Sequence, residues 1–131
     1  MARAFLTDSA KADAAALLDE DREVAIAALR LVKRLEREPY LGDPLREKSN
    51  QTPLAQADCR KVKFDRDDRR PSAKPRYRYR LVYRIEPHEG SPETIVVMAL
   101  GIKPRVYRDA TARVAARLRE QATERVRRTR E

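Results

Sequence analysis

The sequence contains few of the residues on which many active sites are built. It has one cysteine, Cys59, one histidine, His88, three glycines and no tryptophan. A single cysteine excludes an intramolecular disulfide and a cysteine metal cluster, and it is typical of a reducing compartment. With one histidine the usual nucleophile and metal constellations are missing, and three glycines provide no glycine-rich phosphate loop. We therefore expect neither a metal nor a cofactor.

Long apolar segments are also missing. No run approaches the ~20 apolar residues of a membrane span, and the first residues lack the apolar core of a signal peptide. We expect a soluble cytoplasmic protein with no membrane partner.

Positive charge, in contrast, is abundant. Thirty Lys and Arg against 21 Asp and Glu give a net charge of +9, and hydrophobic residues still make up 41% of the chain. The apolar residues fall in periodic blocks, which indicates a single folded domain over residues 1–131. A charge of this sign is expected of proteins that bind phosphate backbones or acidic partners.

Few residues other than the cations are candidates for chemistry. Cys59 precedes a strand with no second histidine to activate it, so we interpret it as a buried or inert thiol rather than a nucleophile. His88 lies between proline and glutamate in a turn, where we expect it to be exposed and without a role. The acidic clusters at 67–68 and 19–21 are interpreted as capping and solubilising residues.

Helical spacing predicts three helices. Residues 7–9, TDS, offer caps for a helix over 10–20, and residues 21–38 carry a wide apolar stripe that Pro39 ends. These two helices are expected to form a hairpin. A last helix is predicted over 106–128, and the highly charged residues 120–131 are predicted to be a frayed tail.

Alternation of side chains predicts the sheet. Strands are expected at 60–64 (RKVKF), 77–85 (YRYRLVYRI) and 93–100 (ETIVVMAL), the last apolar on both faces as a covered central strand would be. Residues 40–58 are predicted to be a connecting loop and residues 66–76 an exposed loop. With a short opening strand at 2–6, this order predicts an α+β domain. Its helical hairpin packs on one face of an antiparallel sheet of three to four strands, and a C-terminal helix follows.

The strand at 77–85 raises the question of what its arginines do. Alternation directs one set of residues inward, Tyr77, Tyr79, Leu81, Tyr83 and Ile85, and the other outward, Arg76, Arg78, Arg80, Val82 and Arg84. If the strand at 60–64 is its neighbour, Lys61, Lys63 and Arg80 converge on the face opposite the helices. Adjacent like charges destabilise a sheet, so an anion such as a phosphodiester would offset them. The alternative is that the arginines line the solvated face of a half-exposed sheet.

Several motifs resemble those of a known family. The segments DCRKVKFD, YRLVYRI and IVVMALGIKPRVYRDATARV follow one another between Asp58 and Leu118, after Gly42-Asp43-Pro44-Leu45 and a helical hairpin. In this order they resemble the successive motifs of the RelE/ParE superfamily of bacterial toxins. The resemblance implies a compact α+β toxin neutralised by a cognate acidic antitoxin, with DNA contacted only through the antitoxin complex. In the RelE branch it implies a metal-independent mRNA endoribonuclease that acts in the ribosomal A site and inhibits translation.

The resemblance also implies which residues act. The family's catalytic positions match Lys61, Lys63, Arg80 and Tyr107, while Lys103 stands where the family commonly has an arginine. Lys103 keeps the charge but loses the bidentate guanidinium fork. Further contacts to RNA are expected from four other arginines, Arg60, Arg78, Arg84 and Arg105.

Such chemistry does not need histidine. An RNA 2′-hydroxyl can attack the neighbouring phosphorus if its proton is removed, the phosphoryl oxygens are stabilised and the leaving oxygen is assisted. We expect a lysine of the 60–64 strand as base, with Arg80 and Lys103 at the phosphoryl oxygens. Tyr107 either contacts a base or the phosphate, or only packs.

Two alternatives remain open. One is a ParE-like toxin that inhibits DNA gyrase, with the same fold and no nuclease site. The other is a catalytically silent relative that binds only RNA or an acidic antitoxin, which the change at Lys103 favours. Retention of Lys61, Lys63, Arg80 and Tyr107 favours the nuclease branch.

Overall fold

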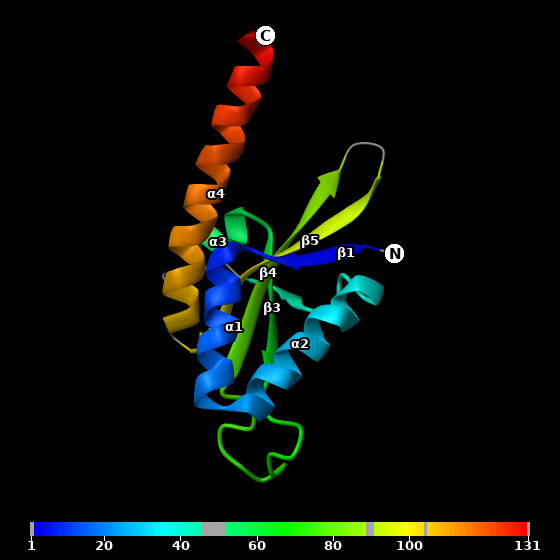
Figure 1. Ribbon diagram of the computed structural model, residues 1–131, viewed down its shortest axis with the longest axis vertical. Helices are drawn as coiled ribbons and strands as arrows, with labels where there is room; N and C mark the ends of the chain where they lie inside the picture. The colour runs from blue at the N-terminus through cyan, green and yellow to red at the C-terminus, as the bar shows by residue number, and fades with distance from the viewer. Residues whose placement is uncertain (1, 46–51, 89–90, 104, 131) are drawn as a thin grey trace.

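In the part of the chain that the structure describes, residues 2–45, 52–88, 91–103 and 105–130, five strands form one mixed sheet with helices against both faces (Figure 1). The structure is a computed structural model. Its elements are β1 (Arg3–Leu6), α1 (Asp8–Glu20), α2 (Arg22–Arg37), β2 (Asp43–Pro44), α3 (Thr52–Gln56), β3 (Cys59–Phe64), β4 (Tyr79–His88), β5 (Ser91–Ile102) and α4 (Arg105–Arg130). The strand order is β1-β5-β4-β3-β2. The β1–β5 pair is parallel, and the other pairs are antiparallel.

The predicted helical hairpin is confirmed, and its caps explain where each helix begins. The Thr7 hydroxyl accepts a hydrogen bond from the Ala10 N–H at 3.2 Å, and the Asp21 carboxylate accepts one from the Val24 N–H at 3.4 Å. Asp21 is therefore a cap, as the sequence predicted for the 19–21 cluster. Helix α2 ends at Arg37, two residues before Pro39.

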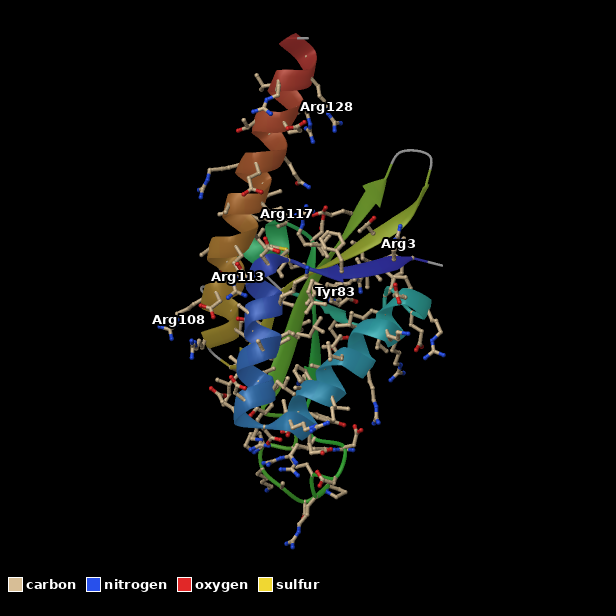
Figure 2. The ribbon with its side chains drawn as sticks, viewed as in Figure 1. Arg3, Tyr83, Arg108, Arg113, Arg117 and Arg128 are labelled. Atoms are coloured by element: carbon tan, nitrogen blue, oxygen red, sulfur yellow. The ribbon has the colours of Figure 1, made fainter. Side chains whose placement is uncertain are left out.

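Helices α1 and α2 pack on one face of the sheet. The inward residues of β4 confirm the predicted alternation, because Leu81 and Tyr83 are fully buried against these helices and Ile85 is partly buried there. Figure 2 shows Tyr83 near the centre of the molecule. Its hydroxyl donates to the Pro39 carbonyl at 2.7 Å and accepts from the Gly42 N–H at 3.0 Å. Gly42 cannot be replaced easily, since a Cβ there would lie 2.8 Å from the Lys61 carbonyl oxygen and from the Tyr83 hydroxyl.

Removing the Tyr83 hydroxyl should weaken the fold. A Tyr83→Phe chain leaves the buried Gly42 N–H without its acceptor, and an unsatisfied buried backbone group costs about 1 to 3 kcal/mol. Urea denaturation should show an unfolding free energy lower by that amount. Tyr79→Phe is the matched control, because it removes a hydroxyl from a neighbouring tyrosine that is only partly buried. Equal stabilities of the two variants would contradict this role of Tyr83.

The opposite face of the sheet is also covered, which corrects the prediction that helices pack on one face only. Val82, Val96 and Met98 are buried there with Val106 and Tyr107 of α4, and with Leu54 of α3. A register shift between Val82 and Tyr83 leaves Met98 unpaired in β5, so Met98 and Ala99 both contribute to this second core. The physical reason for the second layer is visible in β5, whose residues 95–100 are apolar and buried on both sides.

Two further predictions are corrected, and the C-terminal segment is helical. The sheet is mixed and has five described strands rather than three to four antiparallel ones, because the opening segment pairs in parallel with β5. The predicted loop over 40–58 contains β2 and α3, although residues 46–51 lie outside the described part of the chain. Residues 120–130, predicted to fray, continue α4, whose C-terminal part extends past the rest of the chain in Figure 1.

An ion pair joins the two helical layers across the edge of β5. Arg113 of α4 forms an ion pair with Asp13 of α1, and Figure 2 shows Arg113 on the side of α4 that faces α1. Asp13 also accepts from the Leu100 N–H at 3.0 Å, and Arg113 donates to the Met98 carbonyl at 3.1 Å. These side chains satisfy backbone groups of β5 at the point where β1 no longer pairs with it.

Candidate functional site

Three cationic residues of β3 and β4, Lys61, Lys63 and Arg80, lie on the same face of the sheet, as predicted. Lys63 pairs with Arg80 across the β3–β4 ladder, and Lys61 pairs with Val82. On the other side of β4, Arg80 pairs with Gly101 of β5. The strand pairing therefore brings Lys61, Lys63 and Arg80 together at one end of the sheet.

Arg80 is a buried cation that forms no ion pair with a described residue. It is 9% exposed. Its Nη1 donates to the carbonyl oxygens of Tyr77 and Tyr79 at 2.9 and 3.0 Å. None of the ion pairs among the described residues includes Arg80, and its Nε has no hydrogen-bond partner there. A buried charge without a counterion is costly, so such a residue invites a functional explanation.

Tyr107 lies beside this guanidinium, at the start of α4. It is 1% exposed, and apart from Arg80 its hydroxyl has no hydrogen-bond partner among the described residues. Burial raises the pKa of Tyr107, although the charge of the adjacent Arg80 and a side-chain hydrogen bond with it oppose the rise. The hydroxyl is thus neutral at physiological pH and is available as a hydrogen-bond donor. Arg80 and Tyr107 therefore lie next to each other, and neither Arg80 Nε nor Tyr107 Oη has another hydrogen-bond partner among the described residues.

The other predicted catalytic residues surround this pair at the surface. Lys63 is exposed and Lys61 is partly exposed on β3. Lys103 is exposed and directly follows β5, whose last residue, Ile102, pairs with Tyr79. The structure thus collects all five predicted catalytic positions around the start of β4, with Arg80 and Tyr107 inside and the lysines outside.

The four arginines predicted to bind RNA do not form one surface. Arg60 points to the opposite face from Lys61, where it donates to the Gly42 carbonyl at 2.7 Å and stacks on Tyr40 at 4.9 Å. Arg84 donates to the Ala57 carbonyl at 3.1 Å and pairs with Glu86 at 3.0 Å. Arg105 is exposed beside Asp109. Arg60 and Arg84 hold loops in place, and Arg78 does the same.

Arg78 binds a buried carboxylate that the sequence did not single out. Asp65 follows β3, and its side chain is 1% exposed. It accepts from Arg78 Nε at 2.9 Å, from Arg78 Nη2 at 2.8 Å and from the Arg78 backbone N–H at 2.9 Å. Burial acts to raise the pKa of Asp65, but the hydrogen bonds from Arg78 and Arg66 outweigh it and lower that pKa to about 2. Asp65 is the anchor of residues 65–78, which we call the 65–78 loop.

The predicted strand over 77–85 starts later in the structure, because Asp65 binds Arg78. Strand β4 begins at Tyr79 rather than Tyr77. Tyr77, predicted to point inward, is instead 38% exposed in the 65–78 loop. The loop is mostly exposed, as predicted, and contacts the helical hairpin through Arg30–Asp67 at 2.8 Å and Arg66–Asp21 at 3.6 Å. Figure 1 shows it beside the junction of α1 and α2.

Cys59 and His88 are the remaining candidates from the sequence. Cys59 is buried, which confirms the prediction of a buried thiol, and burial raises the pKa of that thiol to about 12. The side chain of His88 lies outside the described residues. Within the described ranges, no group of His, Cys, Asp or Glu side chains is placed to hold a metal ion. None of the described helices has the length and apolar composition to cross a bilayer.

Comparison with protein-family models, curated proteins and solved structures found no match for this chain. The family assignment therefore stays a prediction that depends on the motifs and on the arrangement of Lys63, Arg80 and Tyr107.

Proposed function

We propose that this protein is a RelE-like toxin of a toxin–antitoxin system. It would be an endoribonuclease that cleaves mRNA bound to the ribosome and thereby inhibits translation. The observation that carries the proposal is the buried guanidinium of Arg80, which has no counterion among the described residues. A phosphodiester would supply the missing negative charge. The exposed Lys63 on the neighbouring strand marks the side from which an RNA strand reaches it.

In this reaction each residue has a defined task. A lysine of β3 takes the proton of the 2′-hydroxyl, the O2′–P bond forms, and the P–O5′ bond breaks. Arg80 and Lys103 stabilise the charge on the phosphoryl oxygens, where preorganised donors contribute most to catalysis. The Tyr107 hydroxyl donates a further hydrogen bond to the phosphoryl group. The leaving 5′ oxygen takes up a proton from solvent, so the products are a 2′,3′-cyclic phosphate and a 5′-hydroxyl.

The partner of this toxin is an acidic antitoxin. The net charge of +9 favours association with an acidic chain, and that association should slow as salt screens the charges. Contact with DNA would occur through the antitoxin rather than through this chain.

A second candidate is a ParE-like inhibitor of DNA gyrase, or a silent relative that binds only RNA or the antitoxin. The observation that favours it is the burial of Tyr107, because a 1% exposed side chain contacts a substrate only if α4 shifts. With Tyr107 buried, Lys61 and Lys63 remain at the surface, where they would bind a partner without cleaving RNA.

Parallel assays of the purified chain separate these functions. Added to a translating extract, the chain should fragment mRNA and stop amino-acid incorporation, and it should leave gyrase supercoiling unchanged. Inhibited supercoiling with intact mRNA would establish the ParE-like alternative, and intact mRNA with active gyrase would establish the silent one.

A further inference from the structure

The C-terminal part of α4 extends past the sheet and the other helices (Figure 1). Its side chains are exposed from Leu118 to Thr129, apart from Gln121, which is partly buried and donates to Glu86 at 3.3 Å. Helices in proteins owe most of their stability to the packing of one apolar face. A helical segment with so little packing of its own is therefore a candidate surface for a partner.

One side of this segment is apolar. Leu118, Ala122 and Val126 follow one another at intervals of four residues, so they form a row along the helix. Ala115, which is exposed and precedes Leu118 by three residues, extends the row toward the sheet. We call these four residues the α4 stripe. Leu118 is 41% exposed and Val126 53% exposed, and the small Ala122 between them leaves a recess into which a side chain of another helix can insert.

Two arginines flank the α4 stripe. Arg119 lies three residues before Ala122 and Arg125 three residues after it, so both neighbour Ala122 on the helix surface. Both side chains are exposed, and neither forms an ion pair with another described residue. Their positive charge is therefore available to a partner.

The carboxylates of the same segment lie on another side of the helix. Glu120 and Glu124 each follow a stripe residue by two positions, which places them about 200° further around the helix axis. Glu124 pairs there with Arg127 at 3.9 Å and with Arg128 at 3.7 Å. The side of α4 that carries the stripe thus presents an apolar row between two cations.

These features favour an acidic amphipathic helix over other occupants. A second copy of the stripe would bring Arg119 and Arg125 against like charges. Helices that lie on membranes bury Trp, Phe and Leu side chains, whereas the stripe has one leucine and no aromatic residue. RNA would bind the arginines but leave the apolar row in water. A helix with its own apolar row between carboxylates covers the row and neutralises both arginines.

We propose that the α4 stripe is a docking surface for an acidic amphipathic helix of a partner protein. Apolar side chains of the partner, spaced by three and four residues, contact Leu118 and Val126 and insert beside Ala122. Its flanking carboxylates pair with Arg119 and Arg125. The partner protein would be the antitoxin, an identification that rests on the proposed function.

A synthetic peptide provides a defined probe. It has about three heptads, with leucine at positions a and d and glutamate at e and g, where the glutamates also keep the peptide from pairing with itself. Fluorescence anisotropy of the labelled peptide measures its affinity for the full chain. The acidic peptide should bind. Two matched peptides should not, one with lysine in place of glutamate and one with serine in place of leucine.

Two double variants of the chain test where the peptide binds. Arg119→Gln with Arg125→Gln should weaken binding on the order of 5- to 10-fold, because two exposed ion pairs are lost. Arg127→Gln with Arg128→Gln removes the same net charge from the other side of the helix and should leave the affinity close to that of the wild type. Val126→Ser should weaken binding on the order of 5-fold through lost apolar contact.

The remaining outcomes separate the occupants and the two proposals. Equal weakening in both double variants would show that net charge alone attracts the peptide and would overturn the inference. Dimerisation of the chain, or binding to anionic lipid vesicles, that Val126→Ser abolishes would assign the stripe to a second copy or to a membrane, and would also overturn it. A chain that cleaves mRNA but does not bind the acidic peptide would refute the docking surface alone. Peptide binding that depends on the stripe in a chain that cleaves no RNA would contradict only the proposed function.

Discussion

An Arg80→Met chain should lose about 10² to 10³-fold in mRNA cleavage, the usual effect of removing one preorganised donor from a developing anion. Its melting temperature should stay at or above that of the wild type. The reason is that Arg80 holds a buried charge with no counterion among the described residues, and methionine fills a similar volume without that charge. Removing a residue kept for function at the expense of stability should not destabilise the fold.

Arg78→Met is the matched control from the same strand region. Arg78 neutralises the buried Asp65, so its removal leaves a carboxylate without its main partner and should lower the melting temperature while the folded fraction still cleaves. The two arginines, two positions apart, should thus give opposite patterns. A large drop in the melting temperature of Arg80→Met, or wild-type cleavage by its folded form, would contradict the account.

An Asp65→Ala chain should lose about 3 to 5 kcal/mol of unfolding free energy, the usual cost of removing one member of a buried ion pair. The change leaves Arg78 and Arg69 without their shared carboxylate, so the 65–78 loop loses its anchor. Urea denaturation at pH 7 measures the loss. Asp68→Ala is the control, because Asp68 is an exposed carboxylate of the same loop paired with Arg66, and it should cost no more than about 1 kcal/mol. Similar losses in both variants would refute the anchoring role.

The contribution of Asp65 should also depend on pH. Its folded-state pKa, about 2, lies below the ordinary value of 3.8, so its stabilising effect is present above pH 3.8 and disappears as the pH falls toward 2. Glu86 should add to this acid sensitivity, because Arg117 and Arg84 outweigh its burial and lower its pKa. An Asp65→Asn chain should therefore approach the stability of the wild type as the pH falls from about 4 to about 2. A stability difference that does not change over this range would show that charge is not the cause.

Periodicity predicted the elements that are long enough to display it. The apolar stripe of α2 and the alternation in β3 and β4 identified these elements, and the doubly apolar β5 indicated a strand covered on both sides. The two-residue β2 and the five-residue α3 contain too few residues to show a period. The pairing of β1 with β5 joins residues far apart in the sequence and is set by how α1 and α2 cover the sheet. A four-residue strand does not indicate whether it will pair in parallel or antiparallel.

Alternation also identified the face of each arginine but not its partner. Arg80 and Arg84 both lie on the predicted face, yet Arg84 is bound by Ala57 and Glu86 while Arg80 remains without a counterion in the described chain. Val82 lies between Arg80 and Arg84 on the same face of the sheet and is fully buried. Its burial requires a second layer of residues over this face, which is therefore covered rather than solvated. The interpretation of this face as solvated is therefore wrong, and its interpretation as a working face stays a prediction.

The contact between Asp65 and Arg78 follows from the strand register, but the sequence alone does not give that register. Extending the Phe64–Tyr79 pairing by one residue puts Asp65 opposite Arg78, where the two side chains meet. That register could not be derived from the sequence, because the strands are joined by a long, mixed-charge loop with no recognisable turn type. The exposure of Tyr77 follows from the same anchor, because Asp65 holds Arg78 and β4 begins only at Tyr79.

The most direct test of RNA cleavage at the Arg80 site changes one hydroxyl in the substrate. After the cleavage position in a transcript has been mapped, the nucleotide on the 5′ side of the scissile phosphate is replaced by its 2′-deoxy form. We predict that the unmodified transcript yields a 2′,3′-cyclic phosphate and a 5′-hydroxyl, and that cleavage at the deoxy position stops. Continued cleavage at that position by the wild-type chain would contradict this prediction.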